Sequence, residues 1–82
     1  MNKKLKIYPL KTEDINYPRK NINEYYSQDE LLRLIEKIKS GDESNVIIVK
    51  FSSQGYELVK GSIILEAYKI LQKKIIPAYI QR

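Results

Sequence analysis

Apolar residues recur at helical spacing in two stretches of the chain, and each stretch predicts an amphipathic helix. The first begins at a capping box formed by Ser27 and Glu30 and stops at Gly41. The second runs over about residues 62–72. The positions expected on the apolar stripes are Leu31, Leu34, Ile35 and Ile38 in the first helix, and Ile63, Ile64, Ala67, Ile70 and Leu71 in the second.

Four stretches have the composition or the alternation of strands. The first ends at Pro9, after which Thr12 is placed to cap a short turn. The second is β-branched throughout, which is typical of a strand buried on both faces, and the turn sequence Ser-Ser-Gln-Gly joins it to the third as a hairpin. In the last strand, Pro77 indicates an edge strand or a strand start. The expected strands are residues 5–8, 46–49, 56–59 and 75–80.

The order of these elements predicts a small α+β (α/β) domain. Strand, turn, helix, strand, strand, helix and strand follow one another, and the segment around Pro18 is expected to be irregular. This order fits a mixed sheet of about four strands with two main helices. Residues 1–82 form one domain on this interpretation, and a domain of this size buries only about 60–65% of its chain surface.

The residue types present exclude several kinds of site. The chain has no cysteine and no histidine, which removes thiol chemistry, disulfides, imidazole catalysis and nearly every zinc or transition-metal site. The acidic pairs Glu13-Asp14 and Asp42-Glu43 are adjacent in sequence, and adjacency does not converge two carboxylates on one atom; a helix start or a loop explains each pair better. We therefore expect no enzyme activity, no cofactor and no metal.

The apolar runs of the chain are short, and none has the length of a membrane span. The N-terminal residues also lack the apolar core of a signal peptide. We expect a cytoplasmic protein with no membrane partner.

The charge balance favours polyanionic partners. Fifteen Lys and Arg against ten Asp and Glu give a net charge of +5, although solubility alone explains such a balance equally well. Tyr25 and Tyr26 have the chemistry to stack on bases, but packing is the more common use of such tyrosines. The lysines expected at a basic edge around the second helix are Lys60, Lys69, Lys73 and Lys74, with a solvated face as the alternative to phosphate contact.

Five segments, in order along nearly the whole chain, match the pattern of a known family. They are INYPRKN, DELLRLIEKIKSG, VIIVKF, YELVKGSIILEAYKIL and KIIPAYI. Together they resemble the N-terminal domain of ParB-type partition proteins, within the ParB/sulfiredoxin-like superfamily. By this resemblance Arg19 stands at the arginine of the family's Asn-Pro-Arg, Gly61 at the motif glycine, Ala67 at the helix alanine and Pro77 at the terminal proline.

The departures from the family pattern bear on activity. Family members with nucleotide activity place Glu-Arg-Arg after the glycine, and those arginines grip a triphosphate. This chain has Ser62-Ile63-Ile64 there, and it has Glu66 where another arginine is common. The resemblance thus implies a degenerate phosphate loop at Gly61 and Ser62, with CTP or ATP hydrolysis not expected. The sulfiredoxin reaction is excluded because it needs a cysteine in this loop.

The residues of this loop also have structural interpretations. Gly61 provides the φ freedom of a sharp strand-to-helix junction, and Ser62 is expected as the N-cap. Ile63 is expected as an exposed apolar contact for a partner, unless the N-terminal segment covers it. Arg19 and Lys20 are the best candidates for an anion contact beside this junction, with a solvated loop as the alternative.

The first hypothesis for function is a non-catalytic ParB-like module linked to DNA maintenance, in plasmid partition or a mobile element, that binds DNA or a partner weakly. The alternative is a protein-interaction or self-assembly module, including a homodimer, that uses the altered Gly61 junction. Residual nucleotide binding, or a ParB-like nuclease, is a distant third. The chain ends before the region that carries the DNA-reading domain in full-length partition proteins, so the core module alone is expected.

Overall fold

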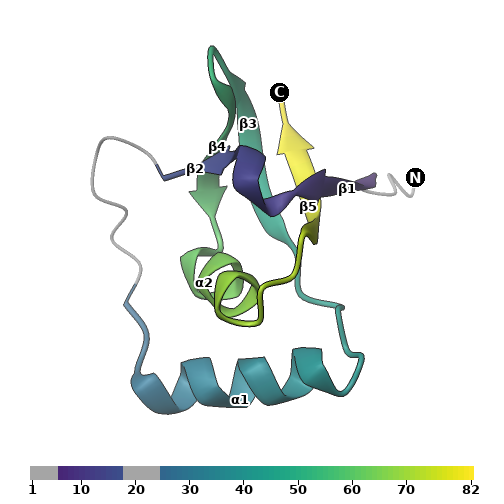
Figure 1. Ribbon diagram of the computed structural model, residues 1–82. Helices are drawn as coiled ribbons and strands as arrows, with labels where there is room; N and C mark the ends of the chain where they lie inside the picture. Colours follow the sequence, from purple (N-terminus) through teal and green to yellow (C-terminus); the bar gives the residue numbers. More distant parts are fainter. Residues whose placement is uncertain (1–5, 18–24) are drawn as a thin grey trace, which may run out of the picture.

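Residues 6–17 and 25–82 are described by a computed structural model of the protein. This part of the chain confirms the expected order of elements and adds one strand to it (Figure 1). The elements are β1 (Ile7–Lys11), the 3-10 helix η1 (Thr12–Asp14), β2 (Ile15–Asn16), α1 (Gln28–Lys39), β3 (Ile47–Ser52), β4 (Gly55–Lys60), α2 (Ser62–Ile70) and β5 (Ile75–Gln81).

The five strands form one mixed sheet in the order β1-β5-β3-β4-β2. β1 pairs with β5 and β3 pairs with β4 in antiparallel orientation. β3 pairs with β5 and β2 pairs with β4 in parallel orientation. The two edge strands are consecutive in sequence and only the three residues of η1 join them. Such a link spans at most about 14 Å, whereas the edges of a flat five-stranded sheet lie about 19 Å apart. The sheet therefore curls toward an open barrel, and η1 crosses between its edges.

β2 is the strand that the sequence pattern did not predict. It has two residues and pairs with Tyr56 and Glu57 of β4. Ile15 is buried in the core, and the Asn16 side-chain amide donates to the carbonyl of Gln54 at 3.2 Å. A segment of two residues is too short to show the alternation of a strand. β2 is therefore defined by its pairing with β4 and not by a local sequence pattern.

The two prolines of the sheet face each other. β1 does not end at Pro9 as expected, because Pro9 lies opposite Pro77 in the antiparallel register of β1 and β5. Two residues without N–H groups are compatible with a rung at which neither strand donates. Nor does Pro77 mark an edge: β5 lies between β1 and β3, and its pairing with β3 begins at Ala78.

α1 has the boundaries that the sequence predicts. Ser27 and Glu30 form the reciprocal capping box, each hydrogen bond measuring 3.1 Å. Gly41 follows the helix at φ +99°, which is the left-handed conformation that ends helices. The apolar stripe is confirmed, with Leu31, Leu34 and Ile38 buried and Ile35 packed against the core.

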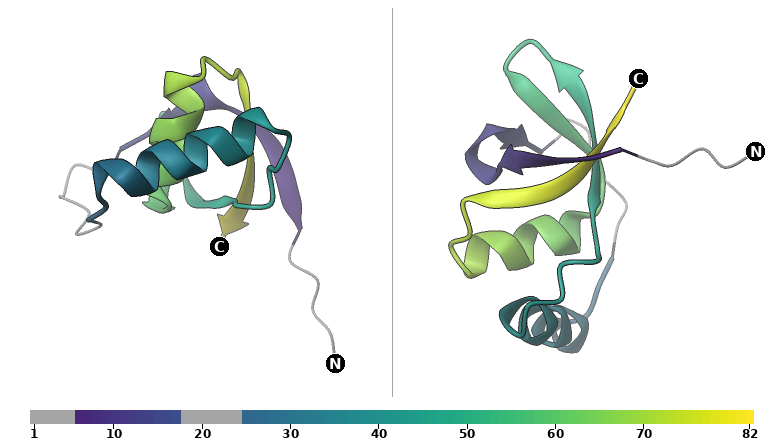
Figure 2. Two further views of the ribbon diagram at one scale, coloured as in Figure 1. Left: turned by 90° about the horizontal axis from the view of Figure 1, so that it is seen from below. Right: turned by 90° about the vertical axis from the view of Figure 1, so that its right-hand side faces the viewer.

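α2 lies between the sheet and α1 (Figure 2). Because it is covered on both sides, its apolar face is wider than predicted: Leu65 and Tyr68 are fully buried beside Ala67. Ile70, expected on the stripe, is half exposed. Thr12 does not cap a turn, because its hydroxyl donates to the carbonyl of Lys73 at 2.9 Å and so ties η1 to the end of this helix.

β3 is buried on one face only. Ile47 and Val49 on its inner face have no exposed surface, while Ile48 on the other face is half-buried. Both helices lie on the inner side of the sheet, with α2 against β3 and α1 packed on α2, so neither helix covers the other face and the expected burial on two faces was wrong. The inner face continues to Phe51, which is 66% exposed because no helix reaches it.

Gly61 fixes the packing of α2 on β3, and this generates the first prediction. An added Cβ at Gly61 would lie 3.0 Å from Ile47 Cγ2 and 3.2 Å from Ile47 Cα, and the φ of +106° disfavours any side chain. We expect Gly61→Ala to lower the free energy of unfolding by about 2–4 kcal/mol in urea denaturation, through backbone strain together with overpacking.

Gly41→Ala is the matched control, because Gly41 has φ +99° but nothing within 4 Å of the added Cβ. It should cost only the backbone term, about 1–2 kcal/mol. Equal losses for the two variants would show that contact with Ile47 does not constrain position 61.

Candidate functional site

The predicted phosphate loop is a junction at which β4 runs directly into α2. Gly61 is the N-cap of α2, with φ +106° and ψ +35°, and its carbonyl accepts from the Leu65 amide at 3.0 Å. Ser62, expected as the N-cap, is instead the first helical residue. The contact with Ile47 and the left-handed backbone already account for the glycine without a ligand.

Ile63 and Ile64 occupy the positions at which the resemblance places gripping arginines. Both are half-buried and both pack against the hydrophobic core. Ile63 is therefore not the exposed apolar spot that the sequence suggested, and its role in binding a partner stays a prediction. The site offers these two residues for packing and not for holding an anion.

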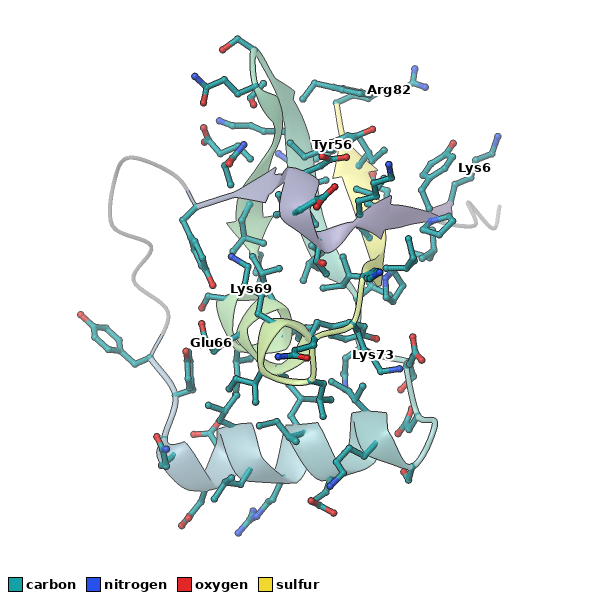
Figure 3. The ribbon with its side chains drawn as sticks, viewed as in Figure 1. Lys6, Tyr56, Glu66, Lys69, Lys73 and Arg82 are labelled. Atoms are coloured by element: carbon teal, nitrogen blue, oxygen red, sulfur yellow. The ribbon has the colours of Figure 1, made fainter. Side chains whose placement is uncertain are left out.

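Glu66 lies about one helical turn after Ile63, at the third position where the resemblance places an arginine. Its carboxylate accepts a hydrogen bond. The Tyr17 hydroxyl donates to Glu66 Oε1 at 3.3 Å. Lys69 Nζ lies over the Tyr17 ring, 4.5 Å from its centroid, which is a cation–π contact. Figure 3 shows Glu66 and Lys69 on the same side of α2. A carboxylate, a phenol and an ammonium group thus fill this place.

The phenol of Tyr17 is held in its protonated form. Partial burial, followed by the charge of Glu66 and the hydrogen bond to it, raises the pKa of Tyr17 to about 12. The neutral phenol therefore donates to the carboxylate at physiological pH. Glu66 itself does not attract a phosphate, because its carboxylate carries the same sign of charge.

Three of the four predicted lysines gather at the C-terminal end of α2. Lys69, Lys73 and Lys74 line a hollow of about 390 Å³, which we call the lysine hollow. Lys60 lies apart from them, at the end of β4 and next to the opposite end of α2. The other residues that line the lysine hollow are Thr12, Glu13, Ile15, Asn16 and Gln72.

Lys73 also has a structural role. Its ammonium group lies 3.4 Å from Glu43 Oε2, and Glu43 Oε1 accepts from the hydroxyl of the buried Tyr68 at 3.2 Å. Burial, followed by the charge of Glu43, raises the pKa of Tyr68. Lys69 and Lys74 are exposed whereas Lys73 is half-buried, so these two are better placed than Lys73 to meet an anion, although Lys69 also makes the cation–π contact with Tyr17.

The remaining binding candidates from the sequence are two cations and two tyrosines, and neither tyrosine lines the lysine hollow. Arg19 and Lys20 fall outside the described residues. Tyr25 is 91% exposed and Tyr26 37% exposed, so both lie at the surface.

The acidic pairs have the structural explanations expected of them. Glu13 and Asp14 belong to η1, while Asp42 accepts from the Ser44 amide at 3.1 Å and from its hydroxyl at 2.7 Å. Those hydrogen bonds lower the pKa of Asp42. Within residues 6–17 and 25–82, acidic side chains do not gather in the groups of three or more that hold a metal ion. Neither α1 nor α2 is long and apolar enough to cross a membrane.

Sequence reasoning missed a larger hollow at the open end of the curled sheet. It measures about 850 Å³, and neither helix contributes to its lining. The signals were the lone phenylalanine and the tyrosines of the strands, which were not singled out in the sequence. We call it the aromatic hollow; Lys6, Tyr8, Pro9, Leu10, Phe51, Tyr56, Tyr79, Ile80, Gln81 and Arg82 line it.

Comparison with solved structures identifies the architecture. C-terminally truncated ParB from Caulobacter crescentus, complexed with CTP-gamma-S, superposes with a TM-score of 0.79 over 94% of this chain at 16% identity. Sulfiredoxin from Arabidopsis thaliana gives 0.76 over 94% at 23% identity. The protein has the ParB/sulfiredoxin-like fold. This confirms the resemblance seen in the sequence at the level of the fold.

The same fold serves different chemistry in its structural neighbours. A free serine kinase in complex with AMP superposes with a TM-score of 0.74 over 96% of this chain at 18% identity. The chain spans 44% of the ParB structure, 85% of the sulfiredoxin structure and 32% of the kinase structure. Neither the protein-family models nor the curated protein sequences contain a match to this chain.

The hydrogen bond between Tyr17 and Glu66 generates the second prediction. Glu66→Gln removes the carboxylate charge, so we expect the pKa of Tyr17 to fall from about 12 part of the way toward its ordinary value of 10. The remaining shift comes from burial. A pH titration of the tyrosine ring carbons by NMR measures it, with Glu36→Gln on the outer face of α1 as the control.

The sign of the effect on stability follows from linkage. A raised pKa means that Tyr17 stabilises the fold below about pH 10 and loses that contribution as the pH rises toward 12. In Glu66→Gln, the stabilising contribution of Tyr17 should therefore be lost at a lower pH than in the parent. A pKa of Tyr17 that is the same in the variant and the parent would contradict the proposed pairing.

Proposed function

We propose that the protein is a non-catalytic module of ParB-like fold that acts in DNA maintenance, such as plasmid partition or a mobile element, in the cytoplasm. It contacts duplex DNA weakly through the lysine hollow or assembles with a partner on DNA. The observation that carries the proposal is the convergence of Lys69, Lys73 and Lys74 on one hollow beside η1. The net charge of +5 acts in the same direction.

The geometry of the lysine hollow suits phosphate oxygens better than bases. Its cations come from the last turn of α2 and the residues after it, and the Thr12 hydroxyl is already committed to the carbonyl of Lys73. Lysine ammonium groups on flexible stems position a duplex through its backbone and carry little sequence information. One carboxylate, Glu13, also lines the hollow and moderates the attraction. Weak binding with steep salt dependence is therefore expected.

The fold neighbours support DNA as the partner class. One of them is a ParB structure complexed to the centromeric parS site, which superposes with a TM-score of 0.79 at 17% identity. At that identity the comparison supports a shared fold and no more. We therefore infer the partner of this chain from the fold together with its lysines.

The Gly61 junction supports the non-catalytic part of the proposal. Half-buried isoleucines and a carboxylate stand where the resemblance places phosphate-gripping arginines. Glu66 is also engaged by Tyr17, so no cation at these three positions compensates a triphosphate. Self-assembly through Ile63 receives less support, because that side chain packs against the core. Ile63→Arg would disrupt a concentration-dependent dimer if this alternative held.

The third prediction concerns duplex DNA. A Lys69→Gln, Lys74→Gln double variant should bind a duplex several-fold more weakly than the parent, and the slope of log K against log salt should fall by about 1.8 because two phosphate contacts are lost. Fluorescence anisotropy over a salt series measures both. Lys39→Gln is the matched control, because Lys39 is exposed on α1 and pairs with Glu36. A parent that gives no binding at low salt would remove the duplex contact from the proposal.

The fourth prediction concerns nucleotides. CTP or ATP with magnesium should leave the NMR amide signals of Gly61 and Ser62 in place, and no nucleotide should be hydrolysed. Saturable shifts at these two amides would revive residual nucleotide binding. Hydrolysis that copurifies with the protein would contradict the non-catalytic role.

A further inference from the structure

The aromatic hollow is the inner face of the sheet continued beyond the helices. On β3 the inner-face residues run from Ile47 and Val49, which have no exposed surface, to Phe51 at 66% exposure. On β1 they run from the buried Leu10 to Tyr8 at 42% exposure. The same faces that close the core under α2 thus form an open concave surface at the other end of the sheet.

Aromatic rings dominate this surface. Tyr8, Phe51 and Tyr56 present rings on it from three different strands, whereas strand alternation turns the ring of Tyr79, which pairs with Ile48, to the other face. Phe51 and Tyr56 face each other in the β3–β4 register, with ring centroids 5.4 Å apart and an angle of 36° between their planes. A concave surface of exposed rings offers flat faces on which a planar group can stack.

The charge of the hollow is of one sign. Lys6 and Arg82 line it, and no aspartate or glutamate does so among the described residues. The neighbouring pair on β3 and β4, Lys50 with Glu57 at 3.4 Å, is turned to the other face by strand alternation. The ligand that complements this surface therefore combines planar rings with negative charge.

Such a combination describes unpaired nucleotides. In a duplex the faces of the bases are stacked on one another, whereas in a single strand they are open to aromatic side chains. A volume of about 850 Å³ lies within the usual range of ligand sites and is wide enough for more than one stacked ring. A neutral apolar peptide would use the rings but leave both cations without a counter-charge.

We propose that the aromatic hollow binds single-stranded DNA. Bases stack on Tyr8, Phe51 and Tyr56, and the adjoining phosphates lie against Lys6 and Arg82. The choice of DNA rests on the proposed function, while the choice of a single strand rests on the hollow alone. Figure 3 shows Lys6, Tyr56 and Arg82 on one side of the β1–η1 segment, with Lys69 and Lys73 on the other. The surfaces for a single strand and for a duplex are therefore separate.

The experiment measures the anisotropy of fluorescein-labelled oligo-dT of about ten nucleotides with the parent chain and with Phe51→Ala. Phe51 is largely exposed, so its truncation removes a stacking surface while leaving the core intact. We expect the affinity for oligo-dT to fall about tenfold. Tyr25→Ala is the matched control, because Tyr25 is an aromatic residue with 91% exposure outside the hollow, and it should leave the affinity unchanged.

An abasic strand of the same length separates stacking from charge. It keeps the phosphates and lacks the bases, so it should bind the parent more weakly than oligo-dT and should not distinguish Phe51→Ala from the parent. Equal affinity of both strands for the parent, or equal affinity of both proteins for oligo-dT, would overturn the proposal. So would a Phe51-dependent dimer in light scattering, since it would make the hollow a protein interface.

The lysine variants keep this proposal distinct from the proposed function. The Lys69→Gln, Lys74→Gln variant should retain the Phe51-dependent binding of oligo-dT. If the parent binds oligo-dT through Phe51 but no duplex, the duplex contact fails and the aromatic hollow stands. If it binds a duplex but no oligo-dT, the aromatic hollow fails and the lysine hollow stands. Tighter Phe51-dependent binding of oligo-U than of oligo-dT would overturn the choice of DNA.

Discussion

A three-residue link between the two edge strands is the constraint on which the rest of the structure depends. Because η1 alone joins β1 to β2, the five-stranded sheet has to curl until its edges approach each other. Two side-chain placements secure this closure: Ile15 is buried inside the curl, and the Thr12 hydroxyl holds η1 against the end of α2. Without the curl, neither the buried core nor the concave surface at the open end would form.

A curled sheet has two ends, and the chain treats them differently. α2 closes one end with Leu65 and Tyr68, and α1 covers α2 from outside. Nothing among the described residues closes the other end, where the inner faces of the strands present the exposed Phe51 beside the half-buried Tyr56. The β1–η1 segment separates this aromatic surface from the lysines at the end of α2. The chain therefore has two chemically distinct surfaces, one lined by aromatic rings and one lined by lysines.

The sequence predicted those parts of the structure that local interactions decide. The capping box of Ser27 and Glu30 involves residues three apart, so its pattern is readable without the fold. β2, by contrast, owes its existence to β4, and the burial of Tyr68 depends on α1 covering α2. The exposure of Phe51 depends on where the helices stop along the sheet. Strand alternation shows that Phe51 shares a face with the core, but only the three-dimensional arrangement shows that this face is open at its position.

Glu66 bears on what a small set of residues can change within a shared fold. The fold neighbours include ParB, sulfiredoxin and a serine kinase, so the fold alone leaves the chemistry undecided. An arginine at position 66 would leave the Tyr17 hydroxyl without its acceptor and would place a second cation one helical turn from Lys69. Tyr17 joins the other two residues, because its hydroxyl donates to Glu66 and its ring lies under the ammonium group of Lys69. These contacts fasten Tyr17, which follows β2 directly, onto α2.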